Sequence, residues 1–217
     1  MNPINLRLRQ VVFKSPPAFH FWNGKEQTGG FSGPFFDFIE QVLRNELQQE
    51  ISTVRVLETG AGLSTLFFLS LGCQTTSFSL PDVIERLSDF FNQEEFATLR
   101  VNWFPHPGRS ELLLGSHAGI FSDSYTCCLI DGSHSVHAVF TDFMYCHETL
   151  SKGGVLFVDD THFPGPNLLA QMIDQLDCYK SCGQFKKLRA FKKTTGRKTF
   201  DNMLDFNFQF PERDLSK

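Results

Sequence analysis

The sequence predicts an α/β fold in which a mostly parallel, seven-stranded sheet carries helices on both faces. Short apolar segments alternate along the chain with longer amphipathic segments, and this alternation is typical of a doubly wound sheet. Residues 54–60, 125–132 and 153–160 are nearly continuously apolar, as the buried central strands of parallel sheets are. All three of these strands also end in acidic residues or glycines, which indicates a functional edge.

The elements follow in order from hydrophobic periodicity and from the positions of glycine and proline. Helices are predicted at 34–50, 61–72, 81–93, 136–150 and 167–179, and strands at 54–60, 75–80, 100–105, 125–132, 153–160, about 185–193 and 198–210. Residues 1–33 show no clear pattern and are predicted to be an irregular segment that forms a lid or an edge element. The chain is therefore expected to be one domain, 1–217, with a leading helix at 34–50 and a core at 54–217.

Composition excludes several classes of function. The chain has 217 residues, 41% of them hydrophobic, and a formal net charge of −4, so nothing favours binding to nucleic acid or to an anionic membrane. The opening "MNPINLRLRQ" lacks the apolar core of a signal peptide, and the six cysteines form no CxxC pair. We expect a cytoplasmic protein with reduced thiols and a small-molecule substrate. The sequence leaves open whether it is a monomer or a homodimer.

Chemistry-bearing residues follow four of the predicted strands. Ligands bind beyond the carboxyl ends of the strands in open α/β sheets. The residues at those ends are Glu58, Gly60, Gly62, Ser79, Asp131, His134, Asp159 and Asp160. This convergence is a stronger indication of a site than any single motif.

The glycine-rich turn at residues 60–62 does not fit a dinucleotide or phosphate site. Thr65 stands where the third glycine of G-x-G-x-x-G would fall, and Glu58 precedes the turn where it would repel a pyrophosphate. An acid there suits a ligand with a positive end, such as an ammonium or a sulfonium. A nicotinamide cofactor is therefore disfavoured.

The segment "VLETGAGLSTLFFLSLG" resembles the first motif of class I S-adenosylmethionine-dependent methyltransferases, which have a Rossmann-like fold. "IDGSHSVHAVFTDF" and "LSKGGVLFVDDTHFPG" are similar to motifs of the small-molecule O-methyltransferases of the catechol, caffeoyl-CoA and macrolide-sugar types. The resemblance covers about residues 28 to 170. It implies transfer of a methyl group to a small hydroxylated molecule, with S-adenosylmethionine as cofactor.

The resemblance also implies roles for individual residues. The cofactor would be held by Glu58, Gly60, Gly62, Ser64, Thr65, Ser79, Ser110, Glu111 and Asp131. In the metal-dependent members, one Mg²⁺ would be held by residues that here are Asp131, Asp159 and Asp160. His134 lies three residues after the strand-end acid, where the macrolide type has a catalytic histidine, so His134 and Asp131 are the catalytic candidates.

Two adjacent carboxylates at the end of a buried strand need an explanation. Like charges about 4 Å apart repel by roughly 1 kcal/mol in water and by several times more in a partly dry site. A metal bound by Asp159 and Asp160 would offset that repulsion and would lower the pKa of a coordinated hydroxyl. His134 could then accept the proton.

Ser79 departs from the family pattern, which places a ribose-binding acid at the end of the second strand. Either Asp82 reaches back, or cofactor affinity is modest, or the chain does not bind the cofactor. The last case is the alternative function: a methyltransferase-fold protein that acts as a binding or scaffold subunit. Other readings also stand: a zinc site at His134, His137 and Asp131, a substrate contact by His162, and an apolar wall over the site from the aromatic residues at 13–22, which could equally form a packed edge.

Overall fold

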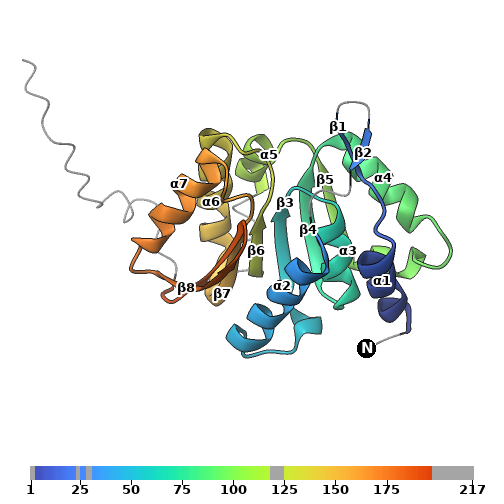
Figure 1. Ribbon diagram of the computed structural model, residues 1–217, viewed down its shortest axis with the longest axis horizontal. Coiled ribbons are helices and arrows are strands. Elements are labelled where there is room, and N and C mark those ends of the chain that lie inside the picture. Colours follow the sequence, from blue (N-terminus) through green and yellow to red (C-terminus); the bar gives the residue numbers. More distant parts are fainter. Residues whose placement is uncertain (1–2, 23–24, 28–30, 118–124, 197–217) are drawn as a thin grey trace, which may run out of the picture.

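The structure, a computed structural model, describes residues 3–22, 25–27, 31–117 and 125–196 (Figure 1). The helices are α1 Pro3–Lys14, α2 Gly33–Glu46, α3 Leu63–Ser70, α4 Pro81–Phe91, α5 Ser110–His117, α6 Val136–Thr149 and α7 Pro164–Asp174, with short 3₁₀ turns η1 Ile51–Thr53 and η2 Ala97–Asn102. The strands are β1 His20–Trp22, β2 Lys25–Gln27, β3 Arg55–Thr59, β4 Gln74–Ser79, β5 Trp103–Pro107, β6 Tyr125–Ile130, β7 Leu150–Val158, β8 Tyr179–Phe185 and β9 Leu188–Lys193.

The main sheet has seven strands in the order β5-β4-β3-β6-β7-β9-β8. Neighbours from β5 to β7 are parallel, whereas β9 is antiparallel to both β7 and β8. The predicted Rossmann-like, mostly parallel sheet is confirmed. The chain order reverses between β3 and β6, and this switch point is where open sheets bind ligands.

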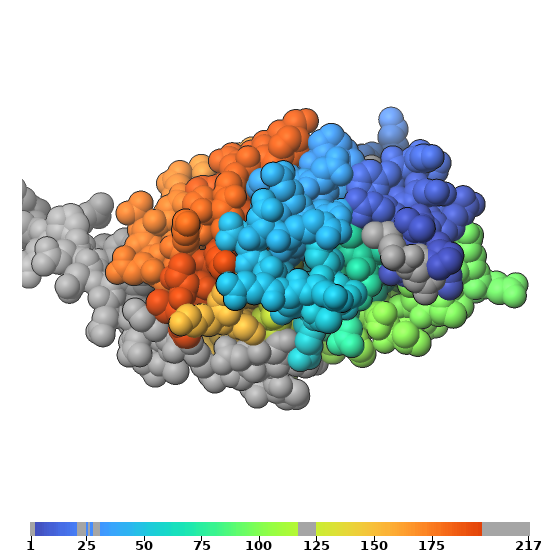
Figure 2. All heavy atoms as spheres, turned by 90° about the horizontal axis from the view of Figure 1, so that it is seen from below, coloured from blue at the N-terminus to red at the C-terminus, as the bar shows by residue number. Residues whose placement is uncertain are grey.

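Helices cover both faces of the sheet and create two apolar cores. Alternate residues of a strand point to opposite faces, so on β6 Cys127 and Leu129 join the core under α1–α4, whereas Cys128 and Ile130 join the core under α5–α7. Figure 2 shows α2 between α1 and the C-terminal strands, and α2 contacts β7, β8 and β9. The central strands are therefore buried on both faces, which explains their continuous apolar sequences.

The N-terminal segment is more regular than expected, and this corrects the prediction for residues 1–33. Helix α1 buries Leu8 and Val12, which are one turn apart, and packs against α3. The sequence pattern did not indicate α1 because its few hydrophobic residues are interrupted by charged ones. Phe13 packs on Phe67, with ring centroids 6.5 Å apart, and Phe19 is 3% exposed. These two rings form a packed edge of the core.

The C-terminal region also differs from the sequence prediction. The helix expected at 167–179 is α7 and ends at Asp174, and the strand at 179–185 was missed. This strand, β8, lies at the sheet edge with mostly exposed residues, so it lacks a hydrophobic pattern. The strand expected at 198–210 lies outside the described residues. A further helix, α5, follows the predicted third strand, which begins at Trp103 after the turn η2.

All six cysteines have free thiols, and five of them are buried. Among the described residues, no helix combines the length and apolarity needed to cross a membrane.

Candidate functional site

The turn after β3 brings two strand ends into close contact. Gly60 has a φ of +87°, and a Cβ atom there would lie 2.2 Å from the carbonyl oxygen of Asp131. The Gly60 amide donates to the Phe78 carbonyl at 2.8 Å, and the Asp131 amide donates to the Thr59 carbonyl at 2.9 Å. A side chain at position 60 would separate β3 from β6, which explains the glycine.

Glu58 lies beneath this turn and is completely buried. Its carboxylate accepts hydrogen bonds from Ser64 (2.8 Å), Ser77 (2.6 Å) and Thr65. Burial raises the pKa of Glu58 to about 7, although the three hydroxyl groups act in the opposite direction. These hydrogen bonds join the end of β3 to the start of α3 and so stabilise the glycine turn between them.

The hydrogen bonds around Glu58 continue across the sheet. Trp103 on β5 donates its indole N–H to Ser77 Oγ at 3.0 Å, and Ser77 on β4 donates to Glu58 on β3. The connection therefore spans three adjacent strands.

A pocket of about 460 Å³ opens above the turn, within the range of small-molecule and cofactor sites. Its lining includes five of the predicted residues, Gly60, Ser79, Ser110, Glu111 and Asp131. It also includes His20, Phe78, Leu80, Val83, Gly108, Arg109, Gly132 and Ser133. The pocket thus follows the carboxyl ends of β3, β4, β5 and β6.

Ser79 lines this pocket at the end of β4, the position at which the sequence resemblance led us to expect an acid. Asp82 lies in the first turn of α4 with a side chain 57% exposed, and it pairs with Arg86 at 3.8 Å. Asp82 does not line the pocket, so the structure does not show it reaching back toward the site.

The segment after β5 contributes a polar wall. Ser110 donates to Asp142 of α6 at 3.0 Å, and burial raises the pKa of Asp142 to about 6. Arg109 forms an ion pair with Glu111, whose side chain is only 6% exposed. Ser110 and Glu111 thus lie at the pocket, with Asp142 supporting Ser110 from behind.

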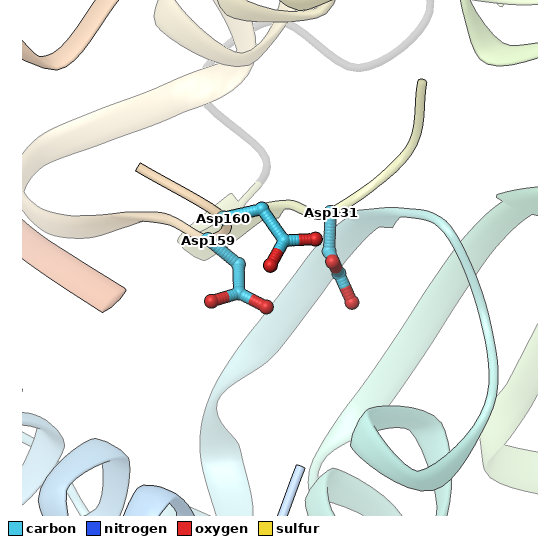
Figure 3. Close-up of side chains that lie close together, drawn as sticks. All are labelled: Asp131, Asp159 and Asp160. Carbon is cyan, nitrogen blue, oxygen red and sulfur yellow. The ribbon is translucent and has the colours of Figure 1, made fainter. Parts of the chain in front are cut away.

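Three carboxylates meet where β6 and β7 end. Asp131, Asp159 and Asp160 each offer an oxygen, and these atoms lie within 4.8 Å of one another (Figure 3). Loss of solvation and then the two neighbouring acids raise the pKa of Asp131 well above its ordinary range. Burial likewise raises the pKa of Asp159.

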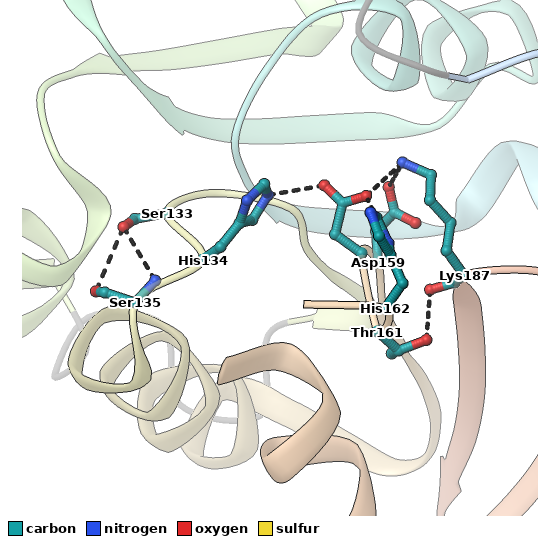
Figure 4. Close-up of polar contacts among 8 residues, drawn as sticks. Ser133, His134, Ser135, Asp159, Thr161, His162 and Lys187 are labelled. Carbon is teal, nitrogen blue, oxygen red and sulfur yellow. Dashed lines mark hydrogen bonds and ion pairs between the residues drawn. The ribbon is translucent and has the colours of Figure 1, made fainter. Parts of the chain in front are cut away.

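A lysine that the sequence did not indicate joins this cluster. Lys187, from the turn between β8 and β9, places Nζ 3.0 Å from Asp159 Oδ2 and 2.5 Å from Asp160 Oδ1 (Figure 4). Burial would lower the pKa of Lys187, but the two carboxylates outweigh it and raise that pKa. The adjacent Asp pair is therefore compensated by an ammonium group.

His134 faces Asp160 from the loop after β6. Its Nε2 lies 2.7 Å from Asp160 Oδ2, and its ring stacks on Phe163 with centroids 4.5 Å apart. Burial would raise the pKa of Asp160, but hydrogen bonds from His134 and Lys187 lower it to about 2. His162 is more distant from Asp160, at 3.7 Å. His137 contacts Thr141 on α6, and the metal-ligand geometry found among the described residues does not include it.

Sequence reasoning missed Lys187, His20 and Arg109. His20 comes from the hairpin β1–β2 and lies over the glycine turn: a Cβ at Gly62 would be 2.9 Å from His20 Nε2. No motif marks these residues, because their positions depend on strand pairing and on the docking of the N-terminal segment. Of the three, only Arg109 lies next to a residue that the sequence did indicate, Ser110.

The comparisons agree with this architecture. Residues 57–161 match a family model described as a methyltransferase domain, and no curated sequence matches the chain. Among solved structures, MycE methyltransferase of the mycinamycin biosynthetic pathway, in complex with Mg and SAH, aligns with a TM-score of 0.55, 17% identity, 89% of this chain and 55% of its own. A putative caffeoyl-CoA O-methyltransferase from Staphylococcus aureus aligns with a TM-score of 0.61, 12% identity, 89% of this chain and 93% of its own.

The chain therefore has a Rossmann-like methyltransferase fold. Residues 57–161 are similar to a methyltransferase domain, and the fold as a whole is similar to those of MycE and of the caffeoyl-CoA O-methyltransferase. The chain spans about half the length of MycE.

Proposed function

We propose that the protein transfers a methyl group from S-adenosylmethionine to an oxygen of a small hydroxylated molecule. The observation that carries this proposal is the position of the His134–Asp160 pair beside a pocket built on the glycine turn. The structures of MycE with Mg and SAH, and with mycinamycin VI as well, support a cofactor of this kind.

The pocket suits the cofactor by its polarity as well as its size. Ser79, Glu111 and Asp131 offer hydrogen-bonding groups, and Phe78 and Val83 offer apolar surface. Pockets for small molecules combine a few placed polar groups with an apolar lining in this way. S-Adenosylmethionine would supply the methyl group.

His134 is proposed as the general base. When Nε2–H donates to Asp160 Oδ2, Nδ1 is the ring nitrogen that accepts the proton of the substrate hydroxyl. Asp160 holds the ring in this orientation and stabilises the imidazolium that forms. The substrate oxygen then bonds to the methyl carbon while the sulfur–methyl bond breaks, which leaves S-adenosylhomocysteine and a methyl ether.

Methyl transfer assisted by a magnesium ion is an alternative mechanism, but the arrangement of residues does not favour it. The buried Asp159 Oδ1 has no hydrogen-bond partner among the described residues, which would suit a cation. However, Lys187 and His134 already contact the two oxygens of Asp160, and Lys187 also contacts Asp159. A magnesium ion would first have to displace Lys187 from these contacts.

Calorimetric titration with S-adenosylhomocysteine tests the cofactor assignment, and two glycines allow a matched comparison. Gly60 and Gly153 have φ values of +87° and +83°, but a Cβ meets the Asp131 carbonyl at position 60 and no atom within 4 Å at position 153. We expect the wild type and Gly153→Ala to bind, and Gly60→Ala to lose binding. Nicotinamide adenine dinucleotide serves as the negative ligand.

Absence of binding by the wild type would contradict the proposal. It would favour the second candidate, a methyltransferase-fold binding or scaffold subunit. The observation in favour of that candidate is Ser79, which lines the pocket in place of a charged acid.

A further inference from the structure

The turn that carries Lys187 is fixed beside the end of β7 by strand register. In the antiparallel pair β7–β9, Val155 faces Lys192 and Val158 faces Arg189. Extending this register by two residues places Lys187 opposite Asp160. Thr161 then anchors the turn, because its amide and its hydroxyl both donate to the Lys187 carbonyl, at 2.9 and 2.7 Å.

The ammonium group of Lys187 is enclosed as well as paired. Its side chain is 20% exposed, and Nζ lies 5.7 and 5.8 Å from the ring centroids of Phe31 and Phe35. Both rings are buried in the core. Aromatic faces attract a cation at this distance, so the two rings and the two carboxylates all stabilise the same charge.

Removal of the Lys187 ammonium group would leave the buried Asp159 carboxylate without its counter-charge. The Asp159 side chain is 0% exposed, and Lys187 is its ion-pair partner. Breaking a buried pair by removing one partner is strongly unfavourable, because the remaining charge has lost both water and its counter-charge. A divalent ion that entered the cluster would have to displace this ammonium group from its carboxylate and aromatic contacts and give up part of its own hydration shell.

We propose that Lys187 is the resident cation of the Asp131–Asp159–Asp160 cluster and takes the place that sequence resemblance gives to a magnesium ion. Lys187 acts as a positioning residue: it holds Asp160, which in turn orients His134. The proposal goes beyond the proposed function in assigning the cluster to an ammonium group. Its first part, occupation of the cation position, does not depend on methyl transfer.

Binding of Mn²⁺, followed by electron paramagnetic resonance of the free ion, tests this assignment without turnover. Mn²⁺ accepts the same hard oxygen ligands as Mg²⁺. The wild type should show no saturable binding at the cluster. Lys187→Met should gain one site, with affinity at least about tenfold higher than any in the wild type, and adding Asp159→Asn should abolish the gain.

The neighbouring lysine provides the control. Lys186 lies in the same turn with a φ of +51° and an exposed side chain whose Nζ faces the rings of Phe35 and Phe185. Lys186→Met should therefore behave like the wild type. Lys187→Gln, which keeps hydrogen-bonding capacity without charge, replaces Lys187→Met if the latter does not fold.

Two results would overturn the proposal. In one, the wild type binds one Mn²⁺ as tightly as Lys187→Met and loses it in Asp159→Asn, which would mean that Lys187 moves aside for a metal. In the other, neither protein binds, which would mean that the cluster has no cation position to exchange. S-Adenosylhomocysteine titration of the same samples reports separately on the proposed function.

Discussion

At the scale of single residues, Glu58 combines an acidic group with complete burial. Burial raises the pKa of Glu58 in the folded state to about 7, whereas the ordinary pKa of a glutamate is 4.5. As pH rises through this interval the unfolded chain releases the proton first, so Glu58 makes the folded state progressively less stable. The difference between the two pKa values corresponds to about 3 kcal/mol of unfolding free energy.

Glu58→Gln should remove this pH dependence. The Gln carbonyl can accept from Thr65 and Ser77 and its amide can donate to Ser64, so the three contacts survive. Between pH 4 and pH 8, we expect the unfolding free energy of the variant to rise relative to that of the wild type by about 3 kcal/mol. Urea denaturation at several pH values measures the difference.

Glu85→Gln is the control for that experiment, because Glu85 lies on α4 with an exposed side chain. Removing a solvated carboxylate should not reproduce the trend. Parallel pH profiles for the wild type and Glu58→Gln would contradict this account, because they would show that the pKa of Glu58 is the same in the folded and unfolded states.

His134→Gln tests the proposed base. The variant should still bind S-adenosylhomocysteine, because the pocket lining does not include position 134, but its turnover with a hydroxylated acceptor should fall by about 10² to 10⁴-fold. His137 is exposed in the first turn of α6, and His137→Gln should keep full turnover. Unchanged activity in His134→Gln would remove this residue from the role of base.

At the scale of elements, helix α1 contributes to stability through one buried face. Leu8 is fully buried, whereas Leu6 on the same helix is 47% exposed. Leu8→Ala should lower the free energy of unfolding by about 2–5 kcal/mol, because it leaves a cavity between α1 and α3. Leu6→Ala should change it by less than about 0.5 kcal/mol, as chemical denaturation can measure.

A small effect of both substitutions would mean that α1 is not docked on the core in solution. That result would restore the interpretation of residues 1–33 as a loosely attached lid. It would also affect the pocket, because His20 reaches the glycine turn from the segment that α1 anchors.

The elements also show which parts of the fold a sequence can specify. Strands β3, β6 and β7 were predictable because burial on both faces leaves a continuous apolar signature. Strand β8 was not, since an edge strand with exposed side chains needs no such pattern. Helix α1 was missed because its buried residues are few and separated by charged ones.

At the scale of the whole molecule, the site residues that the sequence predicted have a local sequence signal, and those that it did not predict have none. Residues that directly follow a strand, such as Gly60, Asp131 and Asp160, were found because topology sends parallel strand ends to one edge. Lys187 and His20 reach that edge from segments far away in the chain. Their positions follow from the β7–β9 register and from packing of the N-terminal hairpin, neither of which a motif encodes.

The hydrogen bonds that join Trp103, Ser77 and Glu58 give the protein an internal optical reporter. The indole N–H of Trp103 donates to the hydroxyl that in turn donates to the Glu58 carboxylate, so the electrostatic environment of the indole depends on the proton that Glu58 holds. Trp103 is one of two tryptophans in the chain. Its emission spectrum is therefore coupled to the ionisation of a carboxyl group two strands away, and the state of the glycine turn can be followed by light without any attached dye.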